Sequence, residues 1–228
     1  MREISGIPFE SGLDPLEWAR FVVKARSEEN YAQAMDVLEA QAAEGAAEAE
    51  FLMGLVYARG QGVRRSFAAA ATWFEKAADK GHLGAMYFLG KMYQRGYGVP
   101  KDNAMAARLY EAPAEGGDAR ARYHLGAMCL EGAGVPRSAE AAAAHFEIAA
   151  AAGHSEAQFV LGQLYKIGCG VERDADRAVD LLVSAAANGH KGARLLLGGM
   201  YETGDGVDAD PDEARRWYRM ASEVTSGP

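Results

Sequence analysis

Residues 161–171 read LGQLYKIGCGV, and this stretch decides the fold because the chain repeats its pattern at a fixed interval. A step of 36 residues forward reaches LGGMYETGDGV at 197–207, and two steps back reach LGKMYQRGYGV at 89–99. Five copies follow one another without an insertion, as one glycine column shows: Gly54, Gly90, Gly126, Gly162 and Gly198. A repeat of this length predicts stacked supersecondary units rather than one mixed core.

Each copy predicts two helices. The first helices are expected over 46–58, 82–94, 118–130, 154–166 and 190–202, because apolar residues recur there at helical spacing. A Gly-x-Gly-Val loop follows each, since glycine tolerates the left-handed backbone of a helix C-cap. The second helices are expected to begin after N-caps that share one column: Ser66, Asp102, Ser138, Asp174 and Asp210.

The glycine column lies inside the first helices, where glycine costs about 1 kcal/mol relative to alanine. We expect close approach of the paired helix to compensate, with small residues such as Ala70 and Ala106 as the facing surface. Pro113 stands in a column that otherwise holds alanine, and it predicts a kink or an early helix end at about 109–114.

The fold class that follows is all-α, a right-handed superhelical α-solenoid of about five 36-residue helix-hairpin repeats with N-terminal capping helices. The predicted organisation is an irregular N-terminus over 1–13, capping helices over 14–45, repeats over 46–222 and a flexible tail over 223–228. Asp14 is the expected N-cap of the first capping helix.

Composition excludes several classes of function. The net charge of −8 argues against non-specific nucleic-acid binding, which needs a basic face. No apolar run approaches the roughly 20 residues that span a bilayer, and the first residues do not have the pattern of a signal peptide. Cys129 and Cys169 do not form a disulfide framework. We therefore expect a cytoplasmic protein that binds neither nucleic acid nor membrane.

The motifs at 89–99, 161–171 and 197–207 resemble those of the Sel1-like repeat family, a relative of the tetratricopeptide repeats. AADKGHLGA at 77–85 and AAANGHKGA at 185–193 match the helix-end motif. The resemblance covers roughly residues 30–222 and implies an adaptor that assembles protein complexes, as do the eukaryotic adaptor of endoplasmic-reticulum-associated degradation and bacterial signalling regulators. Secreted members carry paired cysteines that bridge the two helices, a spacing that Cys129 and Cys169 lack.

No motif predicts an enzyme, a metal or a cofactor. His82, His154 and His190 share a column at the start of the first helices, where capping is the expected role; stacked units about 10 Å apart cannot share a zinc ion. Asp208, Asp210 and Asp212 lack the glycine and glutamate of a calcium loop. Ser-x-x-Lys, Lys-Thr-Gly and Gly-x-Ser-x-Gly are all absent.

Comparing the copies separates constant columns from changing ones. The changing columns fall on one face of the first helix, which lines the concave groove in related superhelices. The predicted groove residues are Leu52, Leu55, Arg59, Phe88, Lys91, Arg95, Arg120, His124, Val160, Gln163, Ile167 and Leu196. An apolar strip with a positive rim predicts binding of a partner's peptide or helix, acidic or phosphorylated. The alternative is that these side chains pack between layers or under the kink expected at Pro113.

The aromatic column of Phe51, Tyr87, Tyr123 and Phe159 recurs too regularly for a ligand ladder, and we expect it to form core between repeats. Two other functions stay open. One is a weak hydrolase of β-lactam-like or ester substrates. The other is a structural protein that self-associates through Trp217 and Tyr218 of the last helix, so that the chain is a monomer or a weak homodimer.

Overall fold

The structure is a computed structural model of the 228-residue chain, and it describes residues 14–25 and 30–223. These residues form helices and loops with no strand. The expected irregular segment 1–13, and residues 224–228 of the expected tail, lie outside the described residues. The chain divides into two compact units, Met1–Pro113 and Ala114–Pro228, and each is described by itself.

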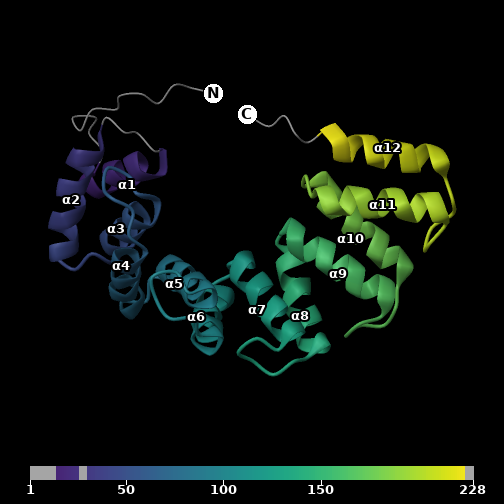
Figure 1. Ribbon diagram of the computed structural model, residues 1–228, viewed down its shortest axis with the longest axis horizontal. Coiled ribbons are helices and arrows are strands. Elements are labelled where there is room, and N and C mark those ends of the chain that lie inside the picture. Colours follow the sequence, from purple (N-terminus) through teal and green to yellow (C-terminus); the bar gives the residue numbers. More distant parts are fainter. Residues whose placement is uncertain (1–13, 26–29, 224–228) are drawn as a thin grey trace. The chain divides into compact units, whose positions relative to one another are not determined.

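Pairs of helices make up both units (Figure 1). The capping helices are α1 (Pro15–Ala25) and α2 (Tyr31–Ala43). The first helices of the five hairpins are α3 (Ala47–Arg59), α5 (Leu83–Arg95), α7 (Ala119–Glu131), α9 (Ser155–Ile167) and α11 (Lys191–Thr203). The second helices are α4 (Phe67–Asp79), α6 (Asn103–Glu115), α8 (Ala139–Ala151), α10 (Ala175–Ala187) and α12 (Pro211–Ser222). The predicted all-α hairpin repeat is confirmed, with the first helices one residue later than expected.

The helix ends follow the predicted capping residues. Ser66 Oγ accepts a hydrogen bond from the backbone N–H of Ala69 at 3.2 Å, and Asp14 and Asp102 cap α1 and α6 in the same way. Each first helix of a hairpin ends at a glycine in the left-handed region, for example Gly60 at φ 71°. The sequence signals for helix boundaries are therefore confirmed.

At most of the glycines inside the first helices, the nearest side chain of the paired helix is an aromatic ring and not an alanine. A Cβ on Gly90 would lie 2.9 Å from the ring of Tyr110, and one on Gly126 would lie 2.8 Å from the ring of Phe146. Phe74 and Tyr218 occupy the same place against Gly54 and Gly198, and Leu182 against Gly162. Close approach is confirmed. The Ala70 column faces the glycine at Gly162, where the carbonyl oxygen of Ala178 would lie 3.2 Å from an added Cβ, whereas rings are nearest at the other four glycines. The alanines are buried, whereas the larger side chain one turn further along fills the gap.

Consecutive hairpins are joined by histidines that cap and stack at once. The Nδ1 atoms of His82, His154 and His190 accept the backbone N–H of Ala85, Ala157 and Ala193 at 3.0 to 3.2 Å. Their rings stack on the aromatic column of the preceding hairpin: Phe51–His82 at 4.4 Å, Tyr123–His154 at 4.9 Å and Phe159–His190 at 4.3 Å. The capping role is confirmed, and so is the inter-repeat role of Phe51, Tyr123 and Phe159. The ring of Tyr87 contacts Phe88 and Tyr110 of its own hairpin.

This arrangement predicts a loss of stability in mild acid. Burial lowers the pKa of His154 below its ordinary value; Glu156 and Asp118 oppose this effect and Arg120 adds to it. The unfolded chain therefore takes up the proton first, and stability falls as pH drops through about 6.5 toward the folded-state pKa. We expect His154→Asp to reduce the change in the free energy of unfolding between about pH 7.5 and 5.5, because the histidine that titrates in this range is gone. Aspartate should still cap the helix, as Asp118 does for α7 in the same column.

Urea unfolding across this pH range measures the effect. The slope becomes weaker rather than flat, because burial and Arg122 also lower the pKa of His145. A His145→Gln variant removes that second contribution. Identical slopes for the wild type and His154→Asp would show that His154 is not the source.

Pro113 does not end its helix. α6 continues to Glu115 and is 13 residues long, as are α4, α8 and α10. The expected early end is therefore wrong. Proline has no N–H to donate, so one backbone hydrogen bond of the helix is lost. Because Pro113 lies only two residues from the helix end, this loss affects only the final turn. The expected kink at 109–114 stays a prediction.

The aromatic residues of α12 pack within its own hairpin and against the preceding one. Tyr218 packs against Gly198, and its hydroxyl donates to Glu202 at 2.8 Å. Trp217 packs against the buried cluster that includes Leu182, Leu197 and Met200. Self-association through these two rings stays a prediction.

Candidate interaction surface

The first helices of successive hairpins form what we call the first-helix wall: α3 and α5 in the first unit, and α7, α9 and α11 in the second. In the first unit this wall contains a hollow of about 300 Å³. Its lining residues come from α3, α4, α5 and the loop after α5: Ala58, Phe67, Phe74, Phe88, Lys91, Met92, Arg95 and Tyr97. Three predicted groove residues, Phe88, Lys91 and Arg95, thus line one hollow.

This hollow has an aromatic floor and a positive edge. Phe88 stacks on Phe74 with ring centroids 5.6 Å apart, and Tyr97 stacks on Phe67 at 5.2 Å. Lys91 Nζ lies 5.8 Å from the centroid of the Tyr87 ring, while Arg95 is exposed. Tyr97 is 45 % exposed although it is a large apolar ring. Such a surface suits an apolar side chain with a carboxylate or phosphate beside it.

The second unit contains a comparable hollow of about 410 Å³. Its lining residues are Leu130, Val160, Gln163, Leu164, Lys166, Ile167, Cys169 and Leu196, which come from α7, α9, the loop after α9 and α11. Ile167 is 68 % exposed, and Lys166 forms an ion pair of 2.8 Å with Asp205. This hollow is aliphatic, and its one cation already has a carboxylate partner.

The two hollows use the same positions of the repeat. A shift of two repeats, 72 residues, converts Phe88 into Val160, Lys91 into Gln163 and Arg95 into Ile167. The same shift pairs Ala58 with Leu130, Met92 with Leu164 and Tyr97 with Cys169. Hollows of similar size therefore recur at one position of the repeat, while their chemistry differs between the units.

Two of the predicted groove residues, Leu52 and Leu55, are buried in the core. Leu52 is 0 % and Leu55 is 4 % exposed, and both belong to the core cluster that holds Trp18, Val22 and Val23 of α1. α1 packs on α3, and Arg20 Nε lies 2.7 Å from Glu48 Oε1, one turn before Leu52. The expectation of an exposed strip at Leu52 and Leu55 is wrong because the capping helix covers it.

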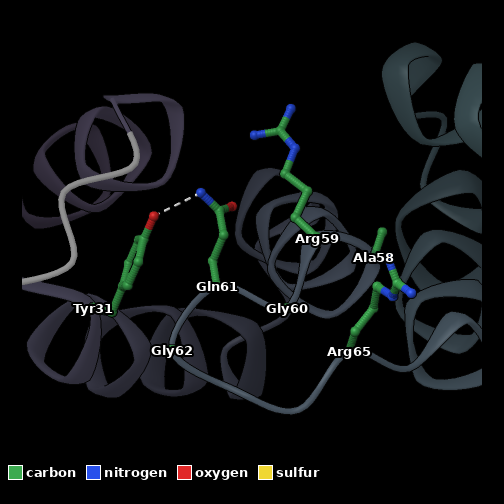
Figure 2. Close-up of a pocket in the computed structure, with 7 residues that line it drawn as sticks. All are labelled: Tyr31, Ala58, Arg59, Gly60, Gln61, Gly62 and Arg65. Atoms are coloured by element: carbon green, nitrogen blue, oxygen red, sulfur yellow. Dashed lines mark hydrogen bonds between the residues drawn. The ribbon is translucent and has the colours of Figure 1, made fainter.

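Arg59 belongs to a separate hollow of about 530 Å³ at the end of α3 (Figure 2). Its lining residues are Tyr31, Ala58, Arg59, Gly60, Gln61, Gly62 and Arg65. Gln61 Nε2 donates to the hydroxyl of Tyr31 at 2.8 Å and to the carbonyl of Val23 at 3.0 Å. This side chain ties the loop after α3 to both capping helices, so we assign Gln61 a structural role.

Arg120 and His124 are not among the residues that line these hollows. Arg120 is held by the N-cap of its own helix: its Nη2 lies 2.6 Å from Asp118 Oδ2 and its Nε lies 3.0 Å from Oδ1. His124 is half-buried, with its ring 5.7 Å from that of Tyr123. The carboxylate of Asp118 offsets much of the positive charge that we expected at Arg120.

Several residues that line the hollows were not predicted, although the sequence contains a signal for them. Tyr97 and Cys169 occupy the variable place of the Gly-x-Gly-Val loop, where the other copies have Gln61, Ala133 and Asp205. Ala58 and Leu130 belong to another changing column, which also contains Lys166. A comparison of all changing columns, loops included, would have found both.

The two cysteines predict contrasting reactivity. Cys129 is buried, and burial raises the pKa of its thiol, whereas Cys169 lies partly exposed at the hollow of the second unit. We expect a maleimide to modify Cys169 at least about 10-fold faster than Cys129 in the native protein, and both equally in denaturant. Peptide mass spectrometry over time measures the two rates. Equal native rates would contradict the burial of Cys129.

Other sites were sought among the described residues. Over 14–25 and 30–223, no group of three or more His, Cys, Asp or Glu side chains is arranged to hold a metal ion. Within the same ranges, none of the helices combines the length and the apolar character that crossing a membrane requires.

Comparison with known proteins gives one family. The model of the family described as Sel1 repeat matches residues 47–82, 84–118, 119–154, 155–190 and 192–224. No curated protein matches the chain significantly.

Solved structures are similar over most of the chain. A Sel1 repeat protein from Oxalobacter formigenes is 30 % identical with a TM-score of 0.83, covering 93 % of this chain and 86 % of that one. A protective antigen with an SLR fold from uropathogenic Escherichia coli strains is 29 % identical with a TM-score of 0.83. That match covers 92 % of this chain but 45 % of the antigen, so this chain spans less than half of its length. An immunity protein from Pseudomonas aeruginosa is 26 % identical with a TM-score of 0.51, covering 77 % of this chain and 64 % of that one.

Proposed function

Because the chain belongs to the Sel1 repeat family, we propose that it is a non-catalytic scaffold that binds a segment of a partner polypeptide on the first-helix wall. Sel1 repeat proteins are in general scaffolds for protein–protein interaction, and their fold typically carries no catalytic site. The finer proposal is that the two hollows are the places where the partner is held.

The recurrence of the hollows carries this proposal. Phe88 and Val160 stand in one column of the repeat and line equivalent hollows, yet they differ in size and chemistry. The columns that pack the hairpins stay apolar or small, as at Ala85, Ala121, Ala157 and Ala193, all 0 % exposed. Residue variation at a constant site on a constant scaffold is what separate binding specificities require.

The partner class follows from charge. Lys91 and Arg95 edge the hollow of the first unit, in a chain whose net charge is −8. A local positive edge on an acidic molecule favours an acidic or phosphorylated segment, through charge-assisted hydrogen bonds and faster encounter.

Affinity capture with the full chain as bait tests the proposal. We expect a Phe88→Ala, Arg95→Glu double variant and an Ile167→Asp variant each to lower recovery of specific partners by at least about 10-fold, which corresponds to about 1.4 kcal/mol. Ile148→Asp is the matched control, because Ile148 is 51 % exposed on α8 and lines neither hollow. Equal recovery by the hollow variants and this control would remove the hollows as binding sites.

A further inference from the structure

We infer that the second unit has a further interaction surface, a hollow of about 460 Å³ beside Tyr201 that receives an arginine side chain of a partner polypeptide. α10 packs on α11 and α11 packs on α12 (Figure 1), and the lining of this hollow comes from α10, the end of α11 and the loop after α11. None of its lining residues lines either hollow of the first-helix wall. It is therefore a separate surface, which we call the acidic hollow.

The acidic hollow is lined by carboxylates that the chain itself leaves largely unpaired. Asp176 and Asp180 come from α10, and Asp208 and Asp210 come from the loop; all four are exposed. Within the described residues, only Asp210 among them makes a side-chain hydrogen bond, as the N-cap of α12. No lysine or arginine is among the residues that line it. A hollow with charge of one sign concentrates ligands of the opposite sign.

Carboxylates alone do not define a ligand, but an equivalent hollow one repeat earlier does. That hollow, of about 430 Å³, is lined by Tyr165, Val171, Glu172, Arg173, Asp174 and Arg177. A shift of 36 residues converts the first five into residues that all line the acidic hollow: Tyr201, Val207, Asp208, Ala209 and Asp210. The two hollows thus occupy one position of the repeat, and the earlier one shows what this position accommodates.

In the earlier hollow the chain supplies its own cation. The guanidinium of Arg177 lies over the ring of Tyr165, with Cζ 4.5 Å from the ring centroid, and its Nη2 lies 3.6 Å from Glu147 Oε1. The hydroxyl of Tyr165 donates to the same carboxylate oxygen at 2.7 Å. The position therefore accommodates a planar guanidinium that stacks on a tyrosine beside a carboxylate.

The acidic hollow has the ring but not the cation. Glu213 stands in the place of Arg177, and it forms an ion pair of 3.0 Å within its own helix. Val183 stands in the place of Glu147, and within the described residues the partly exposed Tyr201 makes no hydrogen bond through its hydroxyl. The four aspartates provide the negative charge instead. An arginine from another polypeptide completes the arrangement through stacking and charge-assisted hydrogen bonds.

Three short peptides provide the probes: acetyl-Gly-Arg-Gly-Arg-Gly-amide and its counterparts with lysine or citrulline in place of arginine. Two basic residues per peptide match the two pairs of aspartates, one from α10 and one from the loop. Citrulline retains the planar group of arginine without its charge, whereas lysine retains the charge without the planar group. Titration of the isotope-labelled full chain at low ionic strength, followed by two-dimensional NMR, gives each Kd and identifies the perturbed amides.

We expect the arginine peptide to perturb the amides of Tyr201, Val207 and Ala209 in a saturable manner. Its Kd should be at least about 10-fold lower than that of the citrulline peptide, because the carboxylates select for charge. It should be at least about 3-fold lower than that of the lysine peptide, because a guanidinium stacks on the ring and forms bidentate hydrogen bonds. An Asp180→Asn, Asp208→Asn double variant, which retains the N-caps of both helices, should raise it at least about 10-fold.

Glu213→Arg is the decisive variant, because it places the chain's own arginine where Arg177 lies one repeat earlier. It should weaken binding of the arginine peptide at least about 10-fold, since the position over the ring is then filled. Glu131→Arg is the matched control, with the same change of charge at an exposed position of α7 that does not line the acidic hollow. It should weaken binding less than about 2-fold. Circular dichroism confirms that the variants are folded.

Three results would overturn the inference. One is an equal Kd for the arginine peptide and either counterpart, and another is an equal effect of Glu213→Arg and Glu131→Arg. The third is the absence of a saturable perturbation at the three amides beside the hollow. None of these results bears on the capture of partners by the hollows of the first-helix wall, which the Phe88, Arg95 and Ile167 variants test on their own.

Discussion

Replacing Gly170 by alanine is expected to lower the free energy of unfolding by about 2–5 kcal/mol. Gly170 has φ of 71°, a left-handed conformation that costs an alanine about 1–2 kcal/mol. A Cβ there would also overlap the carbonyl group of Ala139, the first residue of α8 in the preceding hairpin. Backbone cannot move aside as a side-chain end can, so overpacking adds about 1–3 kcal/mol.

Gly168 in the same loop is the matched control. Its φ is 72°, but the nearest atom to an added Cβ is Arg173 Cβ at 3.3 Å. We expect Gly168→Ala to cost only about 1–2 kcal/mol, from the backbone conformation alone. Urea unfolding followed by circular dichroism measures both variants. Equal losses would show that the loop does not press against α8 and that the hairpins stack less closely than the structure has them.

Removing the Trp18 side chain is expected to cost about 3–5 kcal/mol, as truncating a fully buried large aromatic side chain does. In a repeat protein each unit contacts only its neighbours, so the loss falls on the hairpin to which α1 is attached. We expect Trp18→Ala to raise hydrogen exchange throughout α1 and to uncover Leu52 and Leu55 on α3. Mass spectrometry after short exposures to deuterated water locates the change.

Trp73→Ala serves as the comparison. Trp73 is only half-buried, and Lys76 Nζ lies 4.1 Å from the centroid of its ring on the surface of α4. Its loss should cost about 1 kcal/mol, mainly through the cation–π contact and partial burial. If both tryptophan variants were equally destabilised, or if exchange rose at α9 as much as at α1, then α1 would not be the local cover that we describe.

The features that could be predicted from the sequence are those of residues that follow the 36-residue repeat. The helices, their caps and the inter-repeat aromatic column were predictable, because each signal returns every 36 residues and its physical cause is local. Phe88, Lys91 and Arg95 were found as changing columns on one helix face, and so were Val160, Gln163, Ile167 and Leu196. The structure brings each set to one hollow, within its own unit.

Leu52 and Leu55 were wrongly predicted to be exposed because the sequence of α1 does not follow the repeat pattern. Trp18 stands 36 residues before Gly54, so the glycine column that marks a first helix holds the largest side chain instead. The periodicity therefore carries no information on where α1 packs, and only the tertiary structure shows that it covers α3. Similarly, the Phe74 column was visible beside the Ala70 column, but which of them meets Gly54 depends on the rotation of the helix about its axis.

The recurrence of hollows with different linings at one position of the repeat has an evolutionary consequence. Because each hollow takes its lining from two or three consecutive copies, a recombination event that replaces neighbouring 36-residue copies together would transplant a ready-made specificity. An array of this kind can diversify by shuffling its own modules. Point mutations in the lining would then refine a new preference that the exchange had already introduced.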